Sequence, residues 1–434
     1  MLSQLLFALI LAAAVYLFTS NIRKLIRNIR IGRNIDRSDR SGERWMTMIR
    51  VALGQSKMVT KPIAGFLHII VYAGFVIINI EVLEILIDGL FGTHRVLSFV
   101  GPLYDFLIGS FEILALLVLL ACVVFLIRRN IIRIKRFTMR ELTSWPRTDA
   151  NLILITEILL MSAFLTMNAT DYALQGRGVG HYVQAGAFPV SSFLSGYFAG
   201  FSDHSLELIE RICWWFHIIG ILAFLNYLPY SKHLHILLAF PNTYYSNLEK
   251  KGKFTDMENV SREVKLMMDP AVVLPDPSPS MPQKFGAKDV NDLSWKQLMD
   301  AYSCTECGRC TAECPANQTG KLLSPRKIMM DTRDRLEEVG KGIDKNGADH
   351  KDEKSLFSYI TEEELWACTS CNACVQACPV NIDPLSIIID MRRFLVMEES
   401  KVPSELAGMF TRIENNGAPW QFAQADRAKW TENN

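Results

Sequence analysis

Five long apolar runs constrain the fold of this chain more than any other feature of its sequence. A helix that crosses the hydrocarbon core of a bilayer needs about 20 mainly apolar residues, and each run reaches or approaches that length. The fourth run is short and would need little tilt. We predict five membrane-spanning helices, at about residues 2–19, 63–88, 104–127, 151–168 and 206–230.

The first run is predicted to be a retained membrane helix rather than a secretory signal peptide. No basic segment precedes it, and no small-residue cleavage site follows it. Its basic residues come after the apolar stretch, beginning with Arg23 and Lys24.

Basic residues are unequally distributed among the loops between these runs. Residues 20–61 carry eleven lysines and arginines and residues 128–149 carry seven, whereas 89–103 and 169–205 carry one each. Because basic loops stay on the cytoplasmic side, we expect the N-terminus outside and everything after the fifth run in the cytoplasm of a bacterial inner membrane. The basic loops adjoin membrane spans, so nucleic-acid binding is not expected.

The polar half of the chain, residues 241–434, carries eight of the ten cysteines. They form two runs of the pattern C-x2-C-x2-C-x3-C-P, "CTECGRCTAECP" and "CTSCNACVQACP". Bacterial two-cluster ferredoxins have this pattern, and the fourth cysteine of each run ligates the other cluster. Thiols stay reduced in the cytoplasm, so the spacing indicates metal binding rather than disulfides.

The pattern assigns four cysteines to each of two [4Fe–4S] clusters. The first cluster is predicted to use Cys304, Cys307, Cys310 and Cys378. The second is predicted to use Cys314, Cys368, Cys371 and Cys374. Zinc is the alternative, because CxxC pairs also bind zinc. Two complete four-cysteine runs, each followed by proline, favour the iron–sulfur clusters.

Histidines inside or beside the apolar runs form a second set of candidate ligands. Polar groups at membrane depth are costly and are usually functional. His217 and His235 are 18 residues apart, so one continuous helix would present them on one face, about 27 Å apart. His233 would then point about 160° away from them. This phase favours two haem groups, one near each membrane surface, although Pro229 loosens it.

Depth along the helices predicts which histidines pair. His68 lies near the cytoplasmic end of the second run and His235 lies at a similar level, so we predict that these two ligate an inner haem b. His217 lies towards the outer side, and His94 is its nearest candidate partner. Two more distant candidates are His181 and His204.

Four carboxylates, Glu81, Glu84, Glu112 and Glu157, also fall inside the runs or at their edges. Carboxylates within a membrane can relay protons at a quinone site. For each of them singly, we expect a hydrogen-bonded or headgroup-level side chain instead.

The stretches "FHIIGILAFLNYLPYSKHLH" and "GFLH" resemble helices five and two of the gamma subunit of respiratory nitrate reductase. That family is a five-helix dihaem cytochrome b that exchanges electrons with quinones, and the similarity covers about residues 1–245. The resemblance implies haem b and a quinone substrate for this chain. The family places a second helix-two histidine where this chain has Ile78. The number of haems, one or two, and the partner of His217 therefore stay open.

The cysteine runs lie among predicted helices. "SPRKIMMDTRDRLEEVG" predicts a helix between the runs, with a proline near its start and a glycine at its end, and "DPLSIIIDMRRFLVMEES" predicts another after them. This region resembles the all-helical dicluster ferredoxin of the heterodisulfide reductase electron-transfer subunit. The predicted fold class is all-α: a five-helix transmembrane cytochrome b bundle followed by an α-helical dicluster ferredoxin domain.

The chain divides into four predicted parts. They are the membrane haem b domain 1–245, a charged and then proline-rich linker 246–289, the dicluster domain 290–400 and a C-terminal tail 401–434. In the tail, Trp420 and Trp430 indicate either docking of a partner or packing onto the dicluster domain.

These features predict a membrane-anchored electron-transfer subunit. Electrons would pass between the quinone pool, haem b and two cytoplasmic [4Fe–4S] clusters, to or from a soluble partner. The sequence has no adjacent cysteines, dinucleotide-binding fingerprint or P-loop. We therefore expect the substrate chemistry in a partner subunit of the CCG-domain or flavoprotein type. The direction of flow is not predicted, because potentials depend on the surroundings of each centre. A non-redox, zinc-binding membrane protein for assembly or sensing is the competing hypothesis.

Overall fold

The computed structural model describes residues 1–180, 182, 184–269, 271–273 and 284–432. Within these ranges the chain folds into helices and loops, with one isolated β-bridge and no sheet. This confirms the predicted all-α fold class. His181 and most of the proline-rich linker lie outside the described residues.

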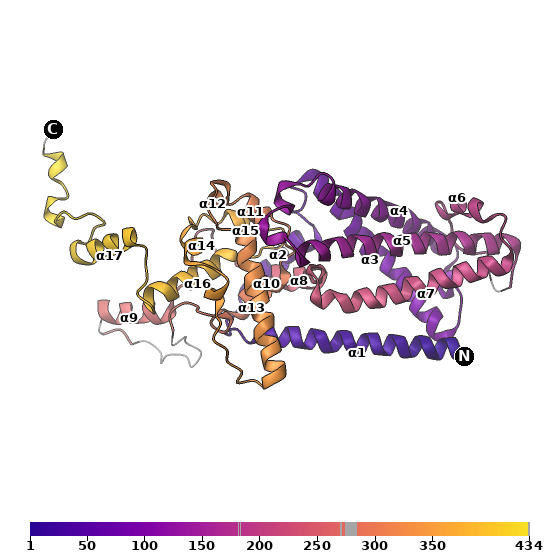
Figure 1. The fold of residues 1–434 in the computed structure, drawn as a ribbon, viewed down its shortest axis with the longest axis horizontal. Helices are drawn as coiled ribbons and strands as arrows, with labels where there is room; N and C mark the ends of the chain where they lie inside the picture. Colours follow the sequence, from indigo (N-terminus) through magenta and orange to yellow (C-terminus); the bar gives the residue numbers. More distant parts are fainter. Residues whose placement is uncertain (181, 183, 270, 274–283, 433–434) are drawn as a thin grey trace.

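Five long apolar helices form an elongated bundle (Figure 1). Each is long enough to cross a bilayer and extends past its predicted run at one end or both. The spans are α1 (Leu2–Arg30), α3 (Pro62–Phe91), α4 (Pro102–Asn130), α5 (Trp145–Arg177) and α7 (Asp203–Tyr227). We call the end of the bundle where α3 begins and α7 ends the cluster end, because the cysteine-containing domain lies beside it (Figure 1). The opposite end is the far end.

Helix α5 corrects one expectation, because the fourth span was predicted to be short and is instead 33 residues long. Polar residues such as Asn168 and Asp171 ended the apolar run in the sequence. Both are buried, and both accept hydrogen bonds from the Arg95 side chain. The helix therefore continues because its polar turns find partners inside the bundle.

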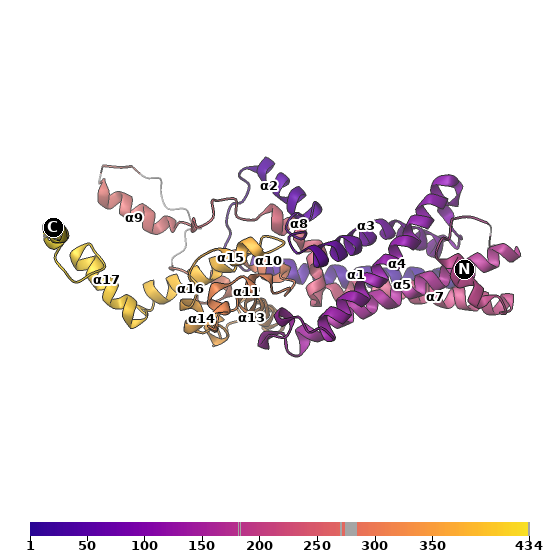
Figure 2. The same ribbon diagram turned by 90° about the horizontal axis from the view of Figure 1, so that it is seen from above.

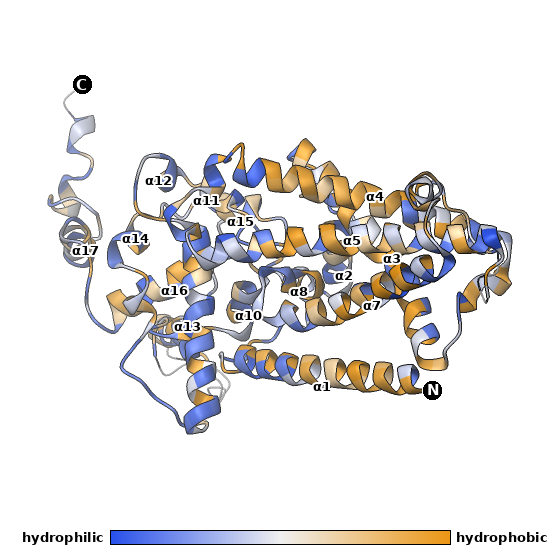
Figure 3. Ribbon diagram, turned by 45° about the vertical axis from the view of Figure 1, so that its right-hand side comes forward, coloured by the Kyte–Doolittle hydropathy of each residue, from blue (hydrophilic) through white to orange (hydrophobic). Residues whose placement is uncertain are grey.

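Glycines allow the spans to approach one another closely. A Cβ at Gly74 of α3 would lie 2.5 Å from Val118 of α4. One at Gly220 of α7 would lie 2.6 Å from Leu160 of α5. Small residues at such crossings are typical of membrane helices, which gain stability from tight packing. The outward faces of the spans remain largely apolar, as expected where lipid is the solvent (Figure 3).

Shorter helices beside the cluster end surround the two cysteine runs (Figure 2). Their core buries Leu298, Ile328 and Met391 completely. The remaining α-helices among the described residues are α2 (Ser41–Met48), α6 (Ser191–Ser195), α8 (His235–Tyr244), α9 (Glu258–Met268), α10 (Trp295–Ser303), α11 (Arg309–Ala312), α12 (Pro315–Gln318), α13 (Pro325–Asn346), α14 (Glu362–Trp366), α15 (Ala373–Ala377), α16 (Pro384–Met397) and α17 (Ser404–Asn416).

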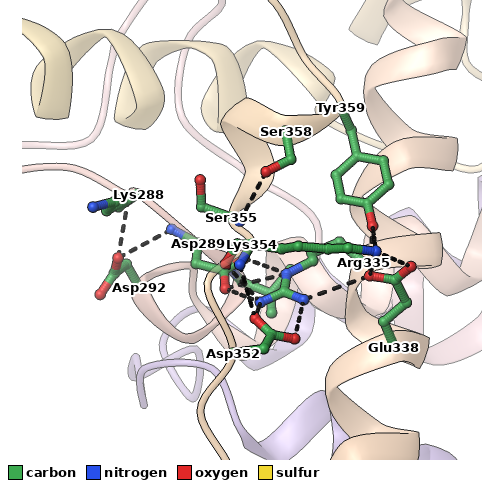
Figure 4. Close-up of polar contacts among 11 residues, drawn as sticks. Lys288, Asp289, Asp292, Arg335, Glu338, Asp352, Lys354, Ser355, Ser358 and Tyr359 are labelled. Atoms are coloured by element: carbon green, nitrogen blue, oxygen red, sulfur yellow. Dashed lines mark hydrogen bonds and ion pairs between the residues drawn. The ribbon is translucent and has the colours of Figure 1, made fainter.

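Arg335 of α13 anchors the loop between the two cysteine runs (Figure 4). Its guanidinium donates hydrogen bonds to Asp289 Oδ2 at 2.7 Å and to Asp352 Oδ1 at 2.6 Å. It also donates to the backbone oxygen of Lys354 at 2.9 Å. This buried arginine therefore holds the segment before the first run and the loop before the second run on the same helix.

The C-terminal end of α1 packs against the cysteine-containing domain. Asn28 donates a hydrogen bond to the Tyr302 hydroxyl at 3.0 Å, and the Arg33 amide donates to the Leu293 carbonyl at 2.7 Å. A Cβ at Gly32 would lie 2.8 Å from that same carbonyl. The first span is therefore attached to the domain that follows the bundle.

The C-terminal tail extends away from the rest of the molecule (Figure 1). No residue of α17 is buried. Trp420 is 38% exposed and Trp430 is 75% exposed. The tail does not pack onto the dicluster domain through these tryptophans in the structure, and partner docking stays a prediction.

Candidate functional site

The first predicted set of cysteines lines one cavity. Its wall contains Cys304, Cys307, Cys310 and Cys378, together with Gly308 and Pro379. In the described part of the chain, no three histidine, cysteine or acidic side chains converge closely enough to hold a single metal ion. Four sulfurs spaced around a cavity fit the four iron corners of an iron–sulfur cube better than a tetrahedral zinc site, where every sulfur lies about 2.3 Å from one metal ion.

The second predicted set also gathers in one place. Cys368 interacts electrostatically with Cys314 and Cys371, and Cys374 interacts with Cys368 and Cys314. The fourth cysteine of the first run thus lies among the first three of the second run. This exchange between runs is what the ferredoxin spacing predicts.

Left-handed backbone turns recur at matching positions of the two runs. The residue before the second cysteine has a positive φ in each run, 54° at Glu306 and 56° at Ser370. The residue after it is also left-handed, at Gly308 (72°) and Asn372 (59°). Such turns point backbone amides at sulfur: the Ser370 amide donates to Cys368 Sγ at 3.4 Å. Glycine and asparagine favour that region, so residue type indicates the turns at Gly308 and Asn372 but not those at Glu306 and Ser370.

The two sets differ in exposure. Cys304 and Cys378 are buried, and burial raises the pKa of each thiol to about 12. A thiol with so high a pKa is inert unless a metal takes the place of its proton. Cys371 is exposed at the surface. Cys314 and Cys374 of the second set are buried as well, so the second set is nearer to solvent only at Cys371.

Two of the predicted haem ligands meet at the cluster end. The ring centres of His68 and His235 are 6.4 Å apart. Two imidazoles on opposite sides of one metal, each with a bond of about 2 Å, have ring centres roughly 6 Å apart. Nδ1 of His235 lies 3.1 Å from the Lys232 carbonyl oxygen, which leaves Nε2 for a metal. Nδ1 of His68 is buried and has no hydrogen-bond partner among the described residues.

His217 and His235 do not lie on one continuous helix, so the predicted common face does not exist. Helix α7 ends at Tyr227, and two 3-10 turns separate it from α8, which begins at His235. The break follows from Pro229 and from the hydrogen bonds that Asp149 accepts from Ser231 Oγ and the Lys232 amide. The prediction that His233 points about 160° away from His217 and His235 was therefore wrong, because it assumed one continuous helix.

His233 in fact lies next to the pair of histidines. Its ring centre is 5.5 Å from that of His235 and 5.2 Å from that of Phe224. Three histidines therefore gather at the cluster end, where the sequence predicted two. The Pro-Tyr-Ser stretch at 229–231 could have indicated the third histidine, because residues on either side of a proline-containing turn do not keep the angular spacing of one helix.

His217 is completely buried between α5 and α7. Its Nδ1 lies 3.0 Å from the Leu160 carbonyl oxygen, and its ring centre is 5.8 Å from that of Phe164. A backbone carbonyl at Nδ1 is a common partner of a metal-binding histidine. Ile78, which occupies the position of the family's second histidine, packs in the same apolar core as Leu160 and Phe164.

The structure does not bring His94 to His217. His94 Nε2 lies 3.6 Å from Asp171 Oδ1 at the far end. Asp171 is eleven residues beyond Leu160 on α5, or about 16 Å along the helix. His94 instead joins a polar network around Arg95, which donates to Asp171 and Asn168.

The intramembrane carboxylates behave largely as expected of structural groups. Glu84 accepts hydrogen bonds from the Leu97 amide and the Tyr104 hydroxyl. Glu112 accepts from Asn168 and from two backbone amides. Glu81 differs, because its buried Oε2 has no hydrogen-bond partner in the described chain.

Known proteins resemble this chain in both halves. Residues 303–382 match the family model described as "4Fe-4S dicluster domain". The chain is 29% identical to "Probable iron-sulfur-binding oxidoreductase FadF" of Bacillus subtilis, covering 99% of this chain and 61% of that protein. It is 25% identical to "EtfAB:quinone oxidoreductase" of Syntrophomonas wolfei, covering 92% of this chain and 55% of that protein.

A third relative matches only part of the chain. It is one of the subunits of the ferredoxin- and F(420)H(2)-dependent CoB-CoM heterodisulfide reductase of Methanosarcina acetivorans, and it is 32% identical over 24% of this chain and 52% of that protein. No solved structure matches the chain. The chain spans less than two thirds of the length of its first two relatives. This chain therefore has five helices long and apolar enough to cross a membrane, contains a 4Fe-4S dicluster domain with eight cysteines, and is related to these iron–sulfur proteins.

Proposed function

We propose that this chain is the membrane-anchored subunit of a quinone-linked oxidoreductase complex. It passes electrons between the quinone pool, haem b in the bundle and the two [4Fe–4S] clusters, to or from a soluble partner subunit. The observation that carries the proposal is the pairing of His68 with His235 at the end of the bundle that holds the dicluster domain.

The residues at that end fit an axially ligated haem. His68 and His235 come from two different helices, α3 and α8, as ligands on opposite sides of one iron require. Bound there, haem b would supply one-electron redox chemistry inside the membrane. The Lys232 carbonyl fixes the ring orientation of His235, and α3 fixes His68 one to two turns after its start. The likeness of these stretches to the nitrate reductase gamma subunit supports the same assignment.

A second haem would use His217, whose Nδ1 is held by the Leu160 carbonyl. His94 is the partner that the sequence suggested, and its contact with Asp171 argues against that pairing. We therefore propose one haem at His68 and His235, with a second at His217 as the open alternative.

The relatives support a quinone and a flavoprotein as the two reaction partners. One of them is named an EtfAB:quinone oxidoreductase, which by its name connects an electron-transfer flavoprotein with a quinone. We propose a soluble flavoprotein or a CCG-domain subunit as the partner of this chain. The basic loops 20–61 and 128–149 lie at the cluster end, which supports a cytoplasmic dicluster domain and an external N-terminus.

Spectroscopy of the purified, detergent-solubilised chain tests the proposal. We expect redox-sensitive Soret and alpha bands, broad iron–sulfur absorbance near about 400 nm, and iron and acid-labile sulfide for two clusters. Addition of a reduced quinol should change the haem bands. A colourless protein that contains zinc would overturn the proposal and restore the zinc alternative.

The haem-to-protein ratio in wild type and His217→Ala decides between one haem and two. If His217 ligates a second haem, the variant loses half of the haem. If it does not, the ratio stays unchanged. His204→Ala is the control. His204 was a more distant candidate partner of His217, but it lies near the start of α7, about 20 Å before His217 along the same helix, so the two cannot ligate one haem.

A further inference from the structure

The loop that carries the first three cysteines is attached to both histidine-bearing segments. Glu306 lies between Cys304 and Cys307, and its carboxylate pairs with the Lys232 ammonium. The carbonyl of that same Lys232 holds Nδ1 of His235. One residue thus connects the first cluster loop with a predicted haem ligand. Glu306 and Lys232 are largely buried, so water screens their pairing little.

A second attachment connects the same loop with the start of α3. Arg309, the neighbour of Cys310, donates hydrogen bonds to the carbonyls of Lys57 at 2.8 Å and Met58 at 3.3 Å. The Met58 carbonyl lies against Gly65, where a Cβ would come within 2.7 Å of it. Gly65 is one helical turn before His68. Gly65 therefore allows the loop that contains Met58 to contact α3 close to His68.

A third membrane loop closes over the same cysteines. Arg326 of the dicluster domain donates to the Arg136 carbonyl at 2.8 Å and to Glu141 Oε1 at 2.8 Å. Gly308, between Cys307 and Arg309, makes room for this crossing, because a Cβ there would lie 2.4 Å from Arg326 Nη1. Residues of three loops at the cluster end therefore meet around residues 304–310.

The second run lacks this enclosure at its first cysteines. Cys371 is exposed, and so is Thr369, which lies two residues before it. Arg392 donates to the carbonyls of Leu365 and Cys368, and these contacts stay within the dicluster domain. The second cluster set also touches the bundle. Lys57 donates to the Val375 carbonyl, next to Cys374, at 3.3 Å, and Lys61 forms an exposed ion pair with Glu313, next to Cys314, at 3.2 Å. Both contacts come from one membrane loop, whereas three loops meet around residues 304–310.

From this asymmetry we propose that the two clusters act in a fixed order. The cluster held by Cys304, Cys307, Cys310 and Cys378 exchanges electrons with the His68–His235 site, and the cluster of Cys371 exchanges them with the soluble partner. Glu306 with Lys232, and Arg309 with the Lys57–Met58 carbonyls, are the positioning contacts of this junction. The inference rests on the proposed haem at His68 and His235.

Each transfer along this order moves a single electron. The donor centre is oxidised by one electron as its neighbour is reduced by one, and no bond is made or broken. The residues at the junction therefore need only to fix distance and exclude water. The rate of electron transfer falls steeply as the distance between two centres grows, so loosening these contacts should slow the transfer.

Two variants distinguish the loss of the contact between the domains from the loss of a positive charge alone. Glu306 pairs with Lys232 of the bundle and, at 2.9 Å, with Arg333 of α13 in its own domain. Lys232→Gln removes the bridge between the domains, whereas Arg333→Gln removes a comparable charge and leaves the bridge intact. Both variants should lower the midpoint potential of the first cluster, because each removes a nearby positive charge. That shared shift identifies the first cluster in electron paramagnetic resonance spectra.

The rate of haem reduction then tests the order. With dithionite as the soluble reductant and rapid freezing, the unshifted cluster should be reduced before the shifted one, and the haem last. Lys232→Gln should slow the haem phase several-fold, shift the haem midpoint potential and leave cluster reduction unchanged. Arg333→Gln should leave the haem potential and the haem phase unchanged. Arg309→Lys, which keeps the charge but loses the paired carbonyl contacts, should slow the haem phase as Lys232→Gln does.

Three outcomes would overturn the order. They are haem reduction before either cluster, equal slowing in Lys232→Gln and Arg333→Gln, and no slowing in both Lys232→Gln and Arg309→Lys. Iron, sulfide and haem contents measured in each variant show that the centres are assembled. A wild-type protein without haem would instead overturn the proposed function, so the two failures are distinguishable.

Discussion

The two ends of the membrane bundle use histidine in different ways. At the far end, His94 lies beside Asp171 in a network in which Arg95, Asn168 and Tyr104 also take part. At the cluster end, His68 and His235 face one another, and Nδ1 of His68 has no partner in the described chain. A polar group buried in a bilayer is costly unless it is paired. The paired histidine is explained by the protein alone, whereas the unpartnered Nδ1 of His68 supports the proposal of a ligand at the cluster end.

The two ends also differ in what their polar contacts connect. At the far end, the polar contacts stay within the bundle: Glu84 accepts a hydrogen bond from Tyr104, and Asp171 accepts one from Arg95. The cluster end opens towards another domain, because its loops carry the contacts to residues 304–310. We expect the far-end network to contribute mainly to stability and the cluster-end contacts mainly to function. Substitutions at either end test this expectation.

Loss of a histidine at the cluster end should have the largest effect. His68→Ala and His235→Ala should each abolish the haem absorbance of the cluster-end site, because axial ligation needs both imidazoles. His94→Ala should retain it. Haem content of the purified protein is the measurement, with iron and sulfide as the control for folding of the dicluster domain.

His233 offers a stringent check on that assignment, because it is the neighbour of His235. We expect His233→Ala to keep its haem. Haem retained in His235→Ala but lost in His233→Ala would show that the ligand had been misidentified between these two neighbours.

Removal of the central cation should have the largest effect at the far end. Arg95→Leu leaves Asp171 buried without its charge partner, and breaking such a pair costs about 3–5 kcal/mol. Thermal unfolding in detergent measures the loss. Arg177→Leu is the control: its pair with Asp203 is partly exposed, and such pairs contribute about 1 kcal/mol or less.

The cluster end has a polar anchor of its own, whose loss should have an intermediate effect. Asp149 is buried and accepts hydrogen bonds from Tyr227, Ser231 and the Lys232 amide. Asp149→Asn places an amide donor where the carboxylate accepts, which should cost about 2 kcal/mol. Because this anchor shapes the turn before His235, haem content should fall along with the unfolding temperature. Unchanged haem content would separate the anchor from the site.

The smallest expected effect comes from a single hydroxyl. Tyr104 accepts from Arg95 at 3.2 Å and donates to Glu84 at 3.0 Å. Tyr104→Phe keeps the ring and removes both hydrogen bonds, at a cost of about 1–2 kcal/mol. Thermal unfolding should register this loss, while the haem spectrum stays unchanged. A spectral change would show that the two ends are coupled.

Much of the fold followed from local patterns in the sequence. Apolar length predicted the five spans, and cysteine spacing predicted the dicluster domain. Both signals arise from requirements that act within one segment: a span must match the bilayer, and a cluster run must wrap a cube. The length of α5 was missed because Asn168 and Asp171 are polar, and their partner Arg95 lies on a different segment.

The candidate site depended more on contacts between segments. Depth arguments paired His68 with His235, and the structure brings those rings together. The predicted orientation of His233 was wrong because a continuous helix was assumed, whereas the helix is interrupted before α8 by a turn that hydrogen bonds to Asp149. The attachments at Glu306 and Arg309 left no trace in the sequence, since neither residue type reveals which distant carbonyl or ammonium it will meet.

The attachment of α1 has a consequence for how the molecule assembles. The hydrogen bonds of Asn28 and Arg33 join residues about 260 positions apart in the chain. During synthesis, the end of α1 therefore waits in the membrane surface while the four later spans insert, and it meets its partner only when the dicluster domain emerges. Contacts of such long sequence separation form late. Until then, α1 is held by its apolar packing in the bundle, where Phe7 and Ala14 share a buried core with Ile85 of α3 and with Ile218 and Leu222 of α7.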